Sequence, residues 1–361
     1  MSMYCGIELL AMKVLGEACK GNQRDVARIL LANRTRLNDL AHWYVEERLG
    51  VSVYALMCDC GLKAIWPNVS IQLMQDQYEQ QQRRTELLLE TLRGIDRRFR
   101  EAGVEYQLLK GLPLAERFYR GIGNRFTWDL DILVRSESLS QASEILEGLG
   151  LHAPRFSRGL LWGAKRVTHA VEFQGRGGVS IDLHWAFRRL PGVRFPAEDV
   201  FGAGGKLEFA GGSYPVSSEE YLLTQLLLSI AADVDRGRCR WRALWDTFLV
   251  FEQMPLSQWG DFLLRREAEG CLGLIAQGAA LVVHSIGVSE QYRGVLDCCE
   301  ASMFGRMAML GPEDSKRLLS RSPNDLRNHL VFARWQAVSG WRYWGWWGVT
   351  LPARAFFARR L

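Results

Sequence analysis

Apolar residues in the N-terminal part of the chain recur at mixed spacings of three and four positions. This spacing covers residues 6–31 and 34–64 and is typical of packed helices. Residues 69–102 carry an apolar stripe through many charges, formed by Leu87, Leu88, Leu89, Leu92, Ile95 and Phe99. The stripe predicts one helix of about nine turns that ends at Gly103. The run EQQQRR at residues 79–84 is expected to be its solvated face.

After Gly103 the pattern changes to short apolar runs separated by turn residues. These runs predict strands over residues 104–109, 127–134, 168–174 and 179–185. Helices are expected over residues 112–119 and 138–149, with Gly150 ending the second. The last two strands are separated by a short glycine-rich segment, residues 175–178, which indicates a hairpin.

Residues 217–252 and 256–310 return to helical spacing. The chain is therefore expected to divide into a helical N-terminal region (1–102), an α/β core (103–215) and a helical C-terminal region (216–361). The basic residues Arg238, Arg240 and Arg242 precede or begin a helix in the last region, where a solvated basic face is the favoured interpretation.

The last part of the chain differs in composition. Residues 335–361 combine five tryptophans with arginines, and this mixture suits a partner surface or a membrane interface. Packing of this tail over the helical region is the favoured alternative, given its prolines, glycines and short length.

Composition narrows the class of protein. The chain has 361 residues, 48% of them hydrophobic, and a formal charge of +5 without a dense block of lysine or arginine. A globular protein is expected, and a dedicated DNA-binding protein is not, whereas anionic small molecules stay open as ligands. No run of about 20 apolar residues predicts a membrane span.

Cysteine usage indicates a reducing compartment. The chain begins without a secretory signal pattern, and its eight cysteines are expected to be free thiols in the cytoplasm. Cys58 and Cys60, like Cys298 and Cys299, lack the two-residue spacer and matched second pair of tetrahedral zinc sites. Buried thiols are the expected outcome.

The candidate chemistry lies in the predicted strands. Asp129 and Asp131 alternate along one strand, which places their carboxylates on one face about 7 Å apart. Asp182 and His184 share one face of a later strand. If the two strands are neighbours, three carboxylates meet in one cleft, and oxygen ligands of this kind suit Mg²⁺. A polar residue on an exposed hairpin face is the equally weighted alternative for Asp182.

These residues also carry a resemblance to a known family. The pair Lys110-Gly111, the sequence from Arg125 to Asp129-Leu130-Asp131, and the segment 181–185 together resemble the uncharacterised bacterial nucleotidyltransferase family of the polymerase-beta-like superfamily. Their order is also similar to the toxin nucleotidyltransferases of abortive-infection systems. The resemblance covers residues 70–250, and Asp246 in the segment WRALWDTFLVF adds to it.

The resemblance implies an α+β fold with a small mixed sheet flanked by helices. It implies Mg²⁺ or Mn²⁺ on Asp129, Asp131 and Asp182, and transfer of a nucleoside monophosphate from a triphosphate, with ATP the expected donor, to an acceptor as pyrophosphate leaves. The superfamily generally has Gly-Ser where this chain has Lys110-Gly111, the residues expected to hold the triphosphate.

Two further residues and two alternatives complete the expectations. Arg125 is a candidate for phosphate contact or for support of the site, and His184 for placing a substrate oxygen or bracing Asp182. The acceptor can be a small molecule, a natural-product intermediate or a macromolecule. A non-catalytic nucleotide-binding or toxin-antitoxin protein on the same fold, or a kinase that uses the same site, remains open.

Overall fold

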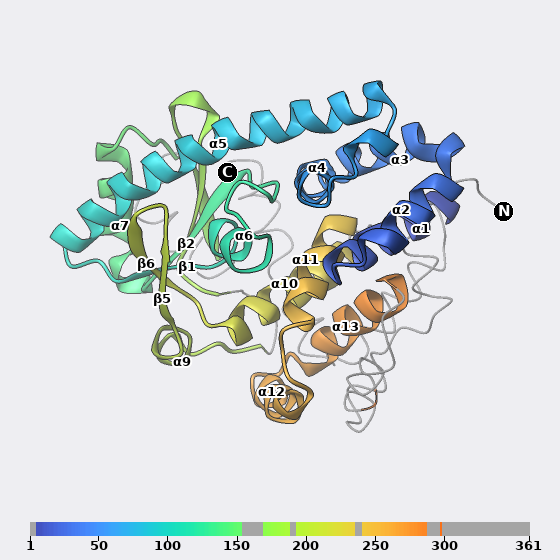
Figure 1. The fold of residues 1–361 in the computed structure, drawn as a ribbon. Helices are drawn as coiled ribbons and strands as arrows, with labels where there is room; N and C mark the ends of the chain where they lie inside the picture. The colour runs from blue at the N-terminus through green and yellow to red at the C-terminus, as the bar shows by residue number, and fades with distance from the viewer. Residues whose placement is uncertain (1–4, 154–168, 188–192, 235–239, 287–296, 298–361) are drawn as a thin grey trace.

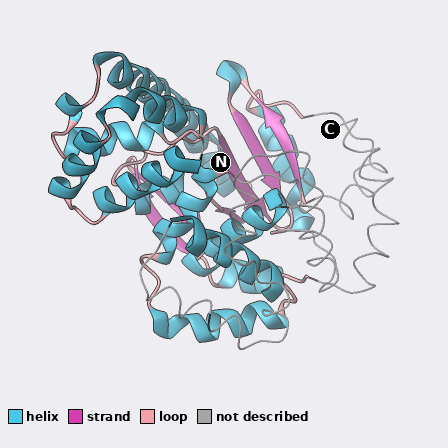
Figure 2. Ribbon diagram, turned by 90° about the vertical axis from the view of Figure 1, so that its right-hand side faces the viewer, coloured by secondary structure: helices cyan, strands magenta, loops and turns pink. Residues whose placement is uncertain are grey.

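The computed structural model describes residues 5–153, 169–187, 193–234, 240–286 and 297 (Figure 1). The Trp/Arg-rich tail, Arg238, Cys298 and Cys299 lie outside the described residues, as do the helices expected beyond residue 286. Figure 2 shows strands and helices mixed in one α+β architecture, as predicted.

The N-terminal region is helical, as its apolar spacing predicts. It contains α1 (Cys5–Cys19), α2 (Gln23–Ala32), α3 (Leu37–Glu46) and α4 (Gly50–Asp59), with short 3-10 turns at Arg34–Arg36 and Lys63–Ile65. The expected long helix is α5 (Asn68–Glu101), which has 34 residues. Gly103 follows it with φ of 68°, a left-handed conformation that stops the helix at the predicted place.

The core is one mixed sheet. Its strands are β1 (Tyr106–Leu108), β2 (Asp129–Val134), β3 (Ala170–Gln174), β4 (Ser180–His184), β5 (Gly205–Phe209) and β6 (Gly212–Val216), in the order β3-β4-β2-β1-β6-β5. The predicted hairpin is confirmed, because β3 and β4 pair antiparallel. β2 lies between β4, to which it is parallel, and β1, to which it is antiparallel.

The hairpin of β5 and β6 was not expected from the sequence pattern. Its turn places Ala210 and Gly211 at φ of 48° and 77°, the positive values that tight hairpin turns require. Alanine at the first position hides this signal, since glycine or asparagine is usual there. This hairpin extends the sheet beyond β1, with which β6 pairs in parallel.

One face of the sheet is closed by helices. Side chains of α5 and of α7 (Leu139–Gly148) pack against alternate residues of the central strands, and this core includes Leu88, Leu92, Phe99, Leu146, Leu130, Ile132, Ile181 and Leu183. Successive side chains of a strand point to opposite faces of the sheet. The opposite face therefore carries Asp129, Asp131, Asp182 and His184. The remaining short elements are α6 (Leu112–Phe118), α9 (Ala197–Gly202) and 3-10 turns at Ser136–Ser138 and Arg176–Gly178.

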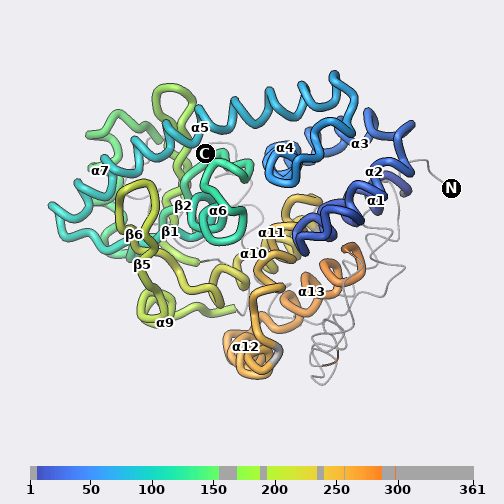
Figure 3. The backbone as a smooth tube through the Cα atoms, in the orientation of Figure 1, coloured from blue at the N-terminus to red at the C-terminus, as the bar shows by residue number. Residues whose placement is uncertain are grey.

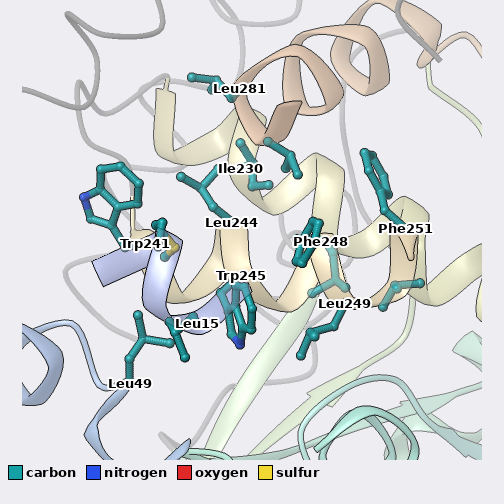
Figure 4. Close-up of a cluster of buried hydrophobic side chains, with 14 of the residues drawn as sticks. Leu15, Leu49, Ile230, Trp241, Leu244, Trp245, Phe248, Leu249, Phe251 and Leu281 are labelled. Carbon is teal, nitrogen blue, oxygen red and sulfur yellow. The ribbon is translucent and has the colours of Figure 1, made fainter. Parts of the chain in front are cut away.

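A second core joins the helical regions. It combines α1 to α4 with α10 (Glu219–Val234), α11 (Trp241–Phe251), α12 (Leu256–Ala268) and α13 (Leu272–Ile286). Figure 4 shows its centre, where Trp241, Trp245, Phe248 and Phe251 of α11 are drawn with Leu15 of α1, Ile230 of α10 and Leu281 of α13. α5 contributes to both cores, with Met74 in this one and Leu88 in the sheet core, and Figure 3 shows it running from α4 to α7.

Among the described helices, none combines the length and the apolar character that crossing a bilayer requires. The longest, α5, has charged residues throughout.

Two adjacent leucines of α5 test its packing on the sheet. Leu88 is fully buried, whereas Leu87 is 40% exposed. We expect Leu88→Ala to lower the free energy of unfolding by about 2 to 5 kcal/mol, because it leaves a cavity under the sheet. Leu87→Ala, the matched control, should lower it by about 0.5 kcal/mol or less. Urea denaturation measures both; similar losses for the two variants would contradict this packing.

Candidate active site

Parallel pairing of β2 and β4 brings the predicted acidic residues together. In this register Asp131 lies opposite Asp182, and Leu133 lies opposite His184. Side-chain oxygens of Asp131 and Asp182 and a ring nitrogen of His184 lie within 4.8 Å of one another. Asp129 lies two residues before Asp131 in β2, so its side chain is on the same face of the sheet. It is not one of the three residues within 4.8 Å of one another. We call Asp129, Asp131 and Asp182 the acidic cluster.

Asp131 is the centre of this cluster. It is 1% exposed, and one of its oxygens, Oδ1, lies 3.1 Å from Lys110 Nζ and 3.1 Å from His184 Nε2. Its other oxygen, Oδ2, is buried without a hydrogen-bond partner in the described part of the chain. The hydrogen bond of His184 thus goes to Asp131 and not to Asp182.

The protein environment separates the pKa values of the three carboxyl groups. Burial raises the pKa of Asp131, but the Lys110 ammonium and the His184 hydrogen bond outweigh burial and hold that pKa below its ordinary value. Burial and then the charge of Asp131 raise the pKa of Asp129. The same two causes raise the pKa of Asp182 to about 7. Asp131 therefore carries its charge most firmly.

Lys110 is held by the same charges. Burial lowers the pKa of Lys110, but attraction to Asp131 and Asp129 outweighs it, so the pKa is raised and the ammonium stays charged. About a third of the Lys110 side chain is exposed to solvent.

This donor set fits a divalent cation. Carboxylate oxygens are the ligands that Mg²⁺ and Mn²⁺ prefer, and the unpartnered Oδ2 of Asp131 is a buried acceptor that a cation would satisfy.

Gly111 shapes the turn between Lys110 and α6. Its φ of 74° and ψ of −111° place it where a side chain is strained. A Cβ there would also lie 3.4 Å from the carbonyl oxygen of Asp129 and 3.4 Å from Thr127 Cγ2. The turn therefore packs directly against the start of β2 and needs glycine.

Arg125 forms a buried ion pair with Asp246 of α11. Its Nε and Nη2 donate to the two carboxylate oxygens of Asp246 at 2.8 and 2.7 Å. Tyr119 Oη donates to the same carboxylate at 2.5 Å, and Arg125 Nη1 donates to Thr127 Oγ1 at 3.1 Å. Burial raises the pKa of Asp246, but Arg125 outweighs it, so the pair is ionised. The structure thus places Arg125 against Asp246 of α11, not in contact with the acidic cluster.

Several residues near the site escaped the sequence analysis. The expected solvated face of α5 is wrong for Gln81, which is 3% exposed, and for Gln82 and Arg84, which hydrogen-bond the loop before β2. Gln81 lies seven positions before Leu88, in phase with the apolar stripe, and this spacing was a usable signal.

The expected solvated basic face is wrong for Arg242. Its Nη1 donates to Phe126 O at 2.8 Å, and burial lowers the pKa of Arg242 to about 10.

The mixed sheet presents acidic residues on adjacent strands beside the turn at Lys110 and Gly111. The chain belongs to the uncharacterised nucleotidyltransferase family, whose profile matches residues 33–287. This confirms the resemblance to the uncharacterised nucleotidyltransferase family. No curated protein matches the chain. An antigenic nucleotidyltransferase-like protein from Paracoccidioides brasiliensis is structurally similar, with a TM-score of 0.29 and 14% identity over 48% of this chain and 75% of that one.

The raised pKa of Asp182 makes stability depend on pH. Between pH 3.8, its ordinary pKa, and about 7, folded Asp182 keeps a proton that the unfolded chain has lost. Raising the pH through this range should therefore lower the melting temperature of the metal-free protein. Asp182→Asn should reduce this decline, as measured by thermal unfolding in EDTA. An identical decline in the variant would contradict the assigned pKa.

The buried ion pair predicts a second stability effect. Asp246→Ala leaves the Arg125 charge buried without its partner, and we expect it to lower the free energy of unfolding by about 3 to 5 kcal/mol. The control is Asp25→Ala, which breaks an exposed pair with Arg28 and should cost about 1 kcal/mol or less. Chemical denaturation compares the two, and equal losses would refute the buried pair.

Proposed function

We propose that this protein is a Mg²⁺-dependent nucleotidyltransferase that transfers a nucleoside monophosphate from a nucleoside triphosphate to an acceptor, with release of pyrophosphate. The observation that carries this proposal is the acidic cluster beside Lys110 and Gly111. Burying like charges in one place costs free energy. A protein that only binds nucleotides has no need of that arrangement, so it favours catalysis over the regulatory alternative.

Asp129, Asp131 and Asp182 would hold the cation, Mg²⁺ or Mn²⁺. When bound, the cation supplies positive charge to the triphosphate and activates the attacking oxygen. Asp131 is suited to this because its charge is held firmly and its Oδ2 is free of other described partners.

Lys110 and Gly111 would bind the triphosphate. Lys110 exchanges its contact with Asp131 for phosphate oxygens, and its partly exposed side chain allows this movement. The conformation of Gly111 lets backbone N–H groups approach the phosphates without a side chain in the way. His184 then remains hydrogen-bonded to Asp131 and keeps its carboxylate in place.

Asp182 would orient the acceptor and take its proton. In the cation-free protein, burial and the charge of Asp131 raise the pKa of Asp182, so among the three carboxyl groups it holds a proton most readily. The acceptor oxygen loses its proton to Asp182 and forms a bond to the α-phosphorus, while the bond from that phosphorus to the pyrophosphate oxygen breaks. Arg125 supports the loop before β2 through Asp246 and Thr127 and has no direct phosphate contact in this proposal.

ATP is the proposed donor and a reducing cytoplasm the proposed compartment. The described cysteines Cys19, Cys58, Cys60 and Cys271 are free thiols, which suits that compartment.

Labelled nucleotides test the reaction. Purified protein with Mg²⁺ is incubated with triphosphates labelled at the α- or the γ-phosphate, and with small-molecule and macromolecular fractions of a cell extract as acceptors. We expect transfer of the α-label and a loss of at least ~100-fold in Asp131→Asn. Asp76→Asn, on the exposed face of α5, is the control and should retain activity.

The pattern of label separates the alternatives. Transfer of the γ-label alone would identify a kinase. Binding of nucleotide without turnover of either label would support the non-catalytic reading, and both results would refute nucleotidyl transfer.

A further inference from the structure

The loop that leads into β2 is held by side chains from helices outside the sheet. Residues 123–128 form this loop, and all but one of its carbonyl groups accept a hydrogen bond from α4, α5 or α11. The donor-to-oxygen pairs are Gln82 Nε2 to Gly123 at 3.0 Å, Ser52 Oγ to Asn124 at 2.9 Å, Arg242 Nη1 to Phe126 at 2.8 Å, Gln81 Nε2 to Thr127 at 3.1 Å and Arg84 Nη2 to Trp128 at 2.6 Å.

Arg84 differs from the other donors because it reaches two segments at once. Its Nε and Nη2 donate to Trp128 O at 3.2 and 2.6 Å. Its Nη1 donates to Gly177 O at 3.3 Å, and Nη2 also donates to Gly178 O at 2.7 Å. The guanidinium lies over the Trp128 ring, 4.4 Å from its centroid.

These contacts lie where backbone pairing between β2 and β4 begins. The register of the two strands starts at Asp129 opposite Ser180. Trp128 immediately precedes Asp129, and Gly178 lies two positions before Ser180. Arg84 therefore bridges the open end of the strand pair that carries the acidic cluster.

The chemistry of arginine suits this place. A planar fork with several fixed donors can reach separate carbonyl oxygens at once, whereas a lysine ammonium is a single point charge on a flexible stem. Stacking on Trp128 also restricts the guanidinium to one plane.

We propose that Arg84 is a positioning residue that fixes the Asp129 carboxylate relative to the Asp182 carboxylate. It does so through the backbone of the two strands. The inference deepens the proposed function and rests on it, since the two carboxylates are the groups that would hold the cation.

Removing Arg84 removes both the bridge between the strands and a positive charge, and these two losses should change cation binding in opposite directions. A positive charge near Asp129 repels a divalent cation, so its removal alone should strengthen binding. Without the bridge, β2 and β4 would hold the carboxylates less firmly, and cation binding should weaken. The loss of groups that orient metal ligands typically costs about 10- to 100-fold in affinity. The sign of the change therefore separates positioning from electrostatics.

The test combines Mn²⁺ titration calorimetry with amide hydrogen exchange of the metal-free full chain. We expect Arg84→Ala to weaken Mn²⁺ affinity about 10- to 100-fold and to speed exchange at residues 126–132 and 177–184. Arg84→Lys keeps the charge and should recover only part of the loss. Arg83→Ala, at an exposed neighbouring position on α5, should change neither quantity.

Unchanged or tighter Mn²⁺ binding in Arg84→Ala would overturn the inference and leave the proposed function standing. If Arg84→Ala does not fold, Arg84→Lys decides in the same way. A wild-type protein that binds no Mn²⁺ would instead refute the proposed cation site. In that case amide hydrogen exchange alone decides. Unchanged exchange of β2 and β4 in Arg84→Ala overturns the inference, and faster exchange supports the bridge.

Discussion

The site depends on bringing carboxylates of two neighbouring strands close together in a partly buried place. Such an arrangement is costly because like charges repel and because burial removes them from water. The protein offsets part of this cost at Asp131 with the Lys110 ammonium and the His184 ring. Oδ2 of Asp131 is left buried without a hydrogen-bond partner among the described residues, and this acceptor is what makes the cluster suited to a cation.

The rest of the structure holds these strands in place. α5 and α7 close one face of the sheet, so the acidic residues are confined to the other. The turn at Gly111 packs on the start of β2, and the buried pair of Arg125 and Asp246 ties the loop before β2 to α11. Both helical regions therefore contribute to the geometry of a site that lies on the sheet.

Much of the fold and part of the site could be predicted from the sequence, because the signals are local. The alternation of side chains along a strand placed Asp129 and Asp131 on one face, and the glycine-rich turn placed Asp182 in a hairpin. The parallel pairing of β2 with β4 is a long-range contact that the periodicity of the sequence does not reveal, so the proximity of Asp131 and Asp182 could be expected only if the two strands were neighbours.

Other contacts have no local signal in the sequence. The partner of Arg125 is 121 residues away, and Arg84 acts through backbone carbonyls, which have no sequence signature. The β5–β6 hairpin was missed because Ala210 occupies a position that usually shows glycine or asparagine.

Crystals of the protein grown with Mn²⁺ and a non-hydrolysable nucleoside triphosphate give the most direct test, because manganese can be located by its anomalous scattering. The account predicts anomalous peaks bounded by carboxylate oxygens of Asp129, Asp131 and Asp182, with Lys110 turned from Asp131 to phosphate. Nucleotide bound elsewhere, with no manganese at these carboxylates and Lys110 still on Asp131, would contradict it.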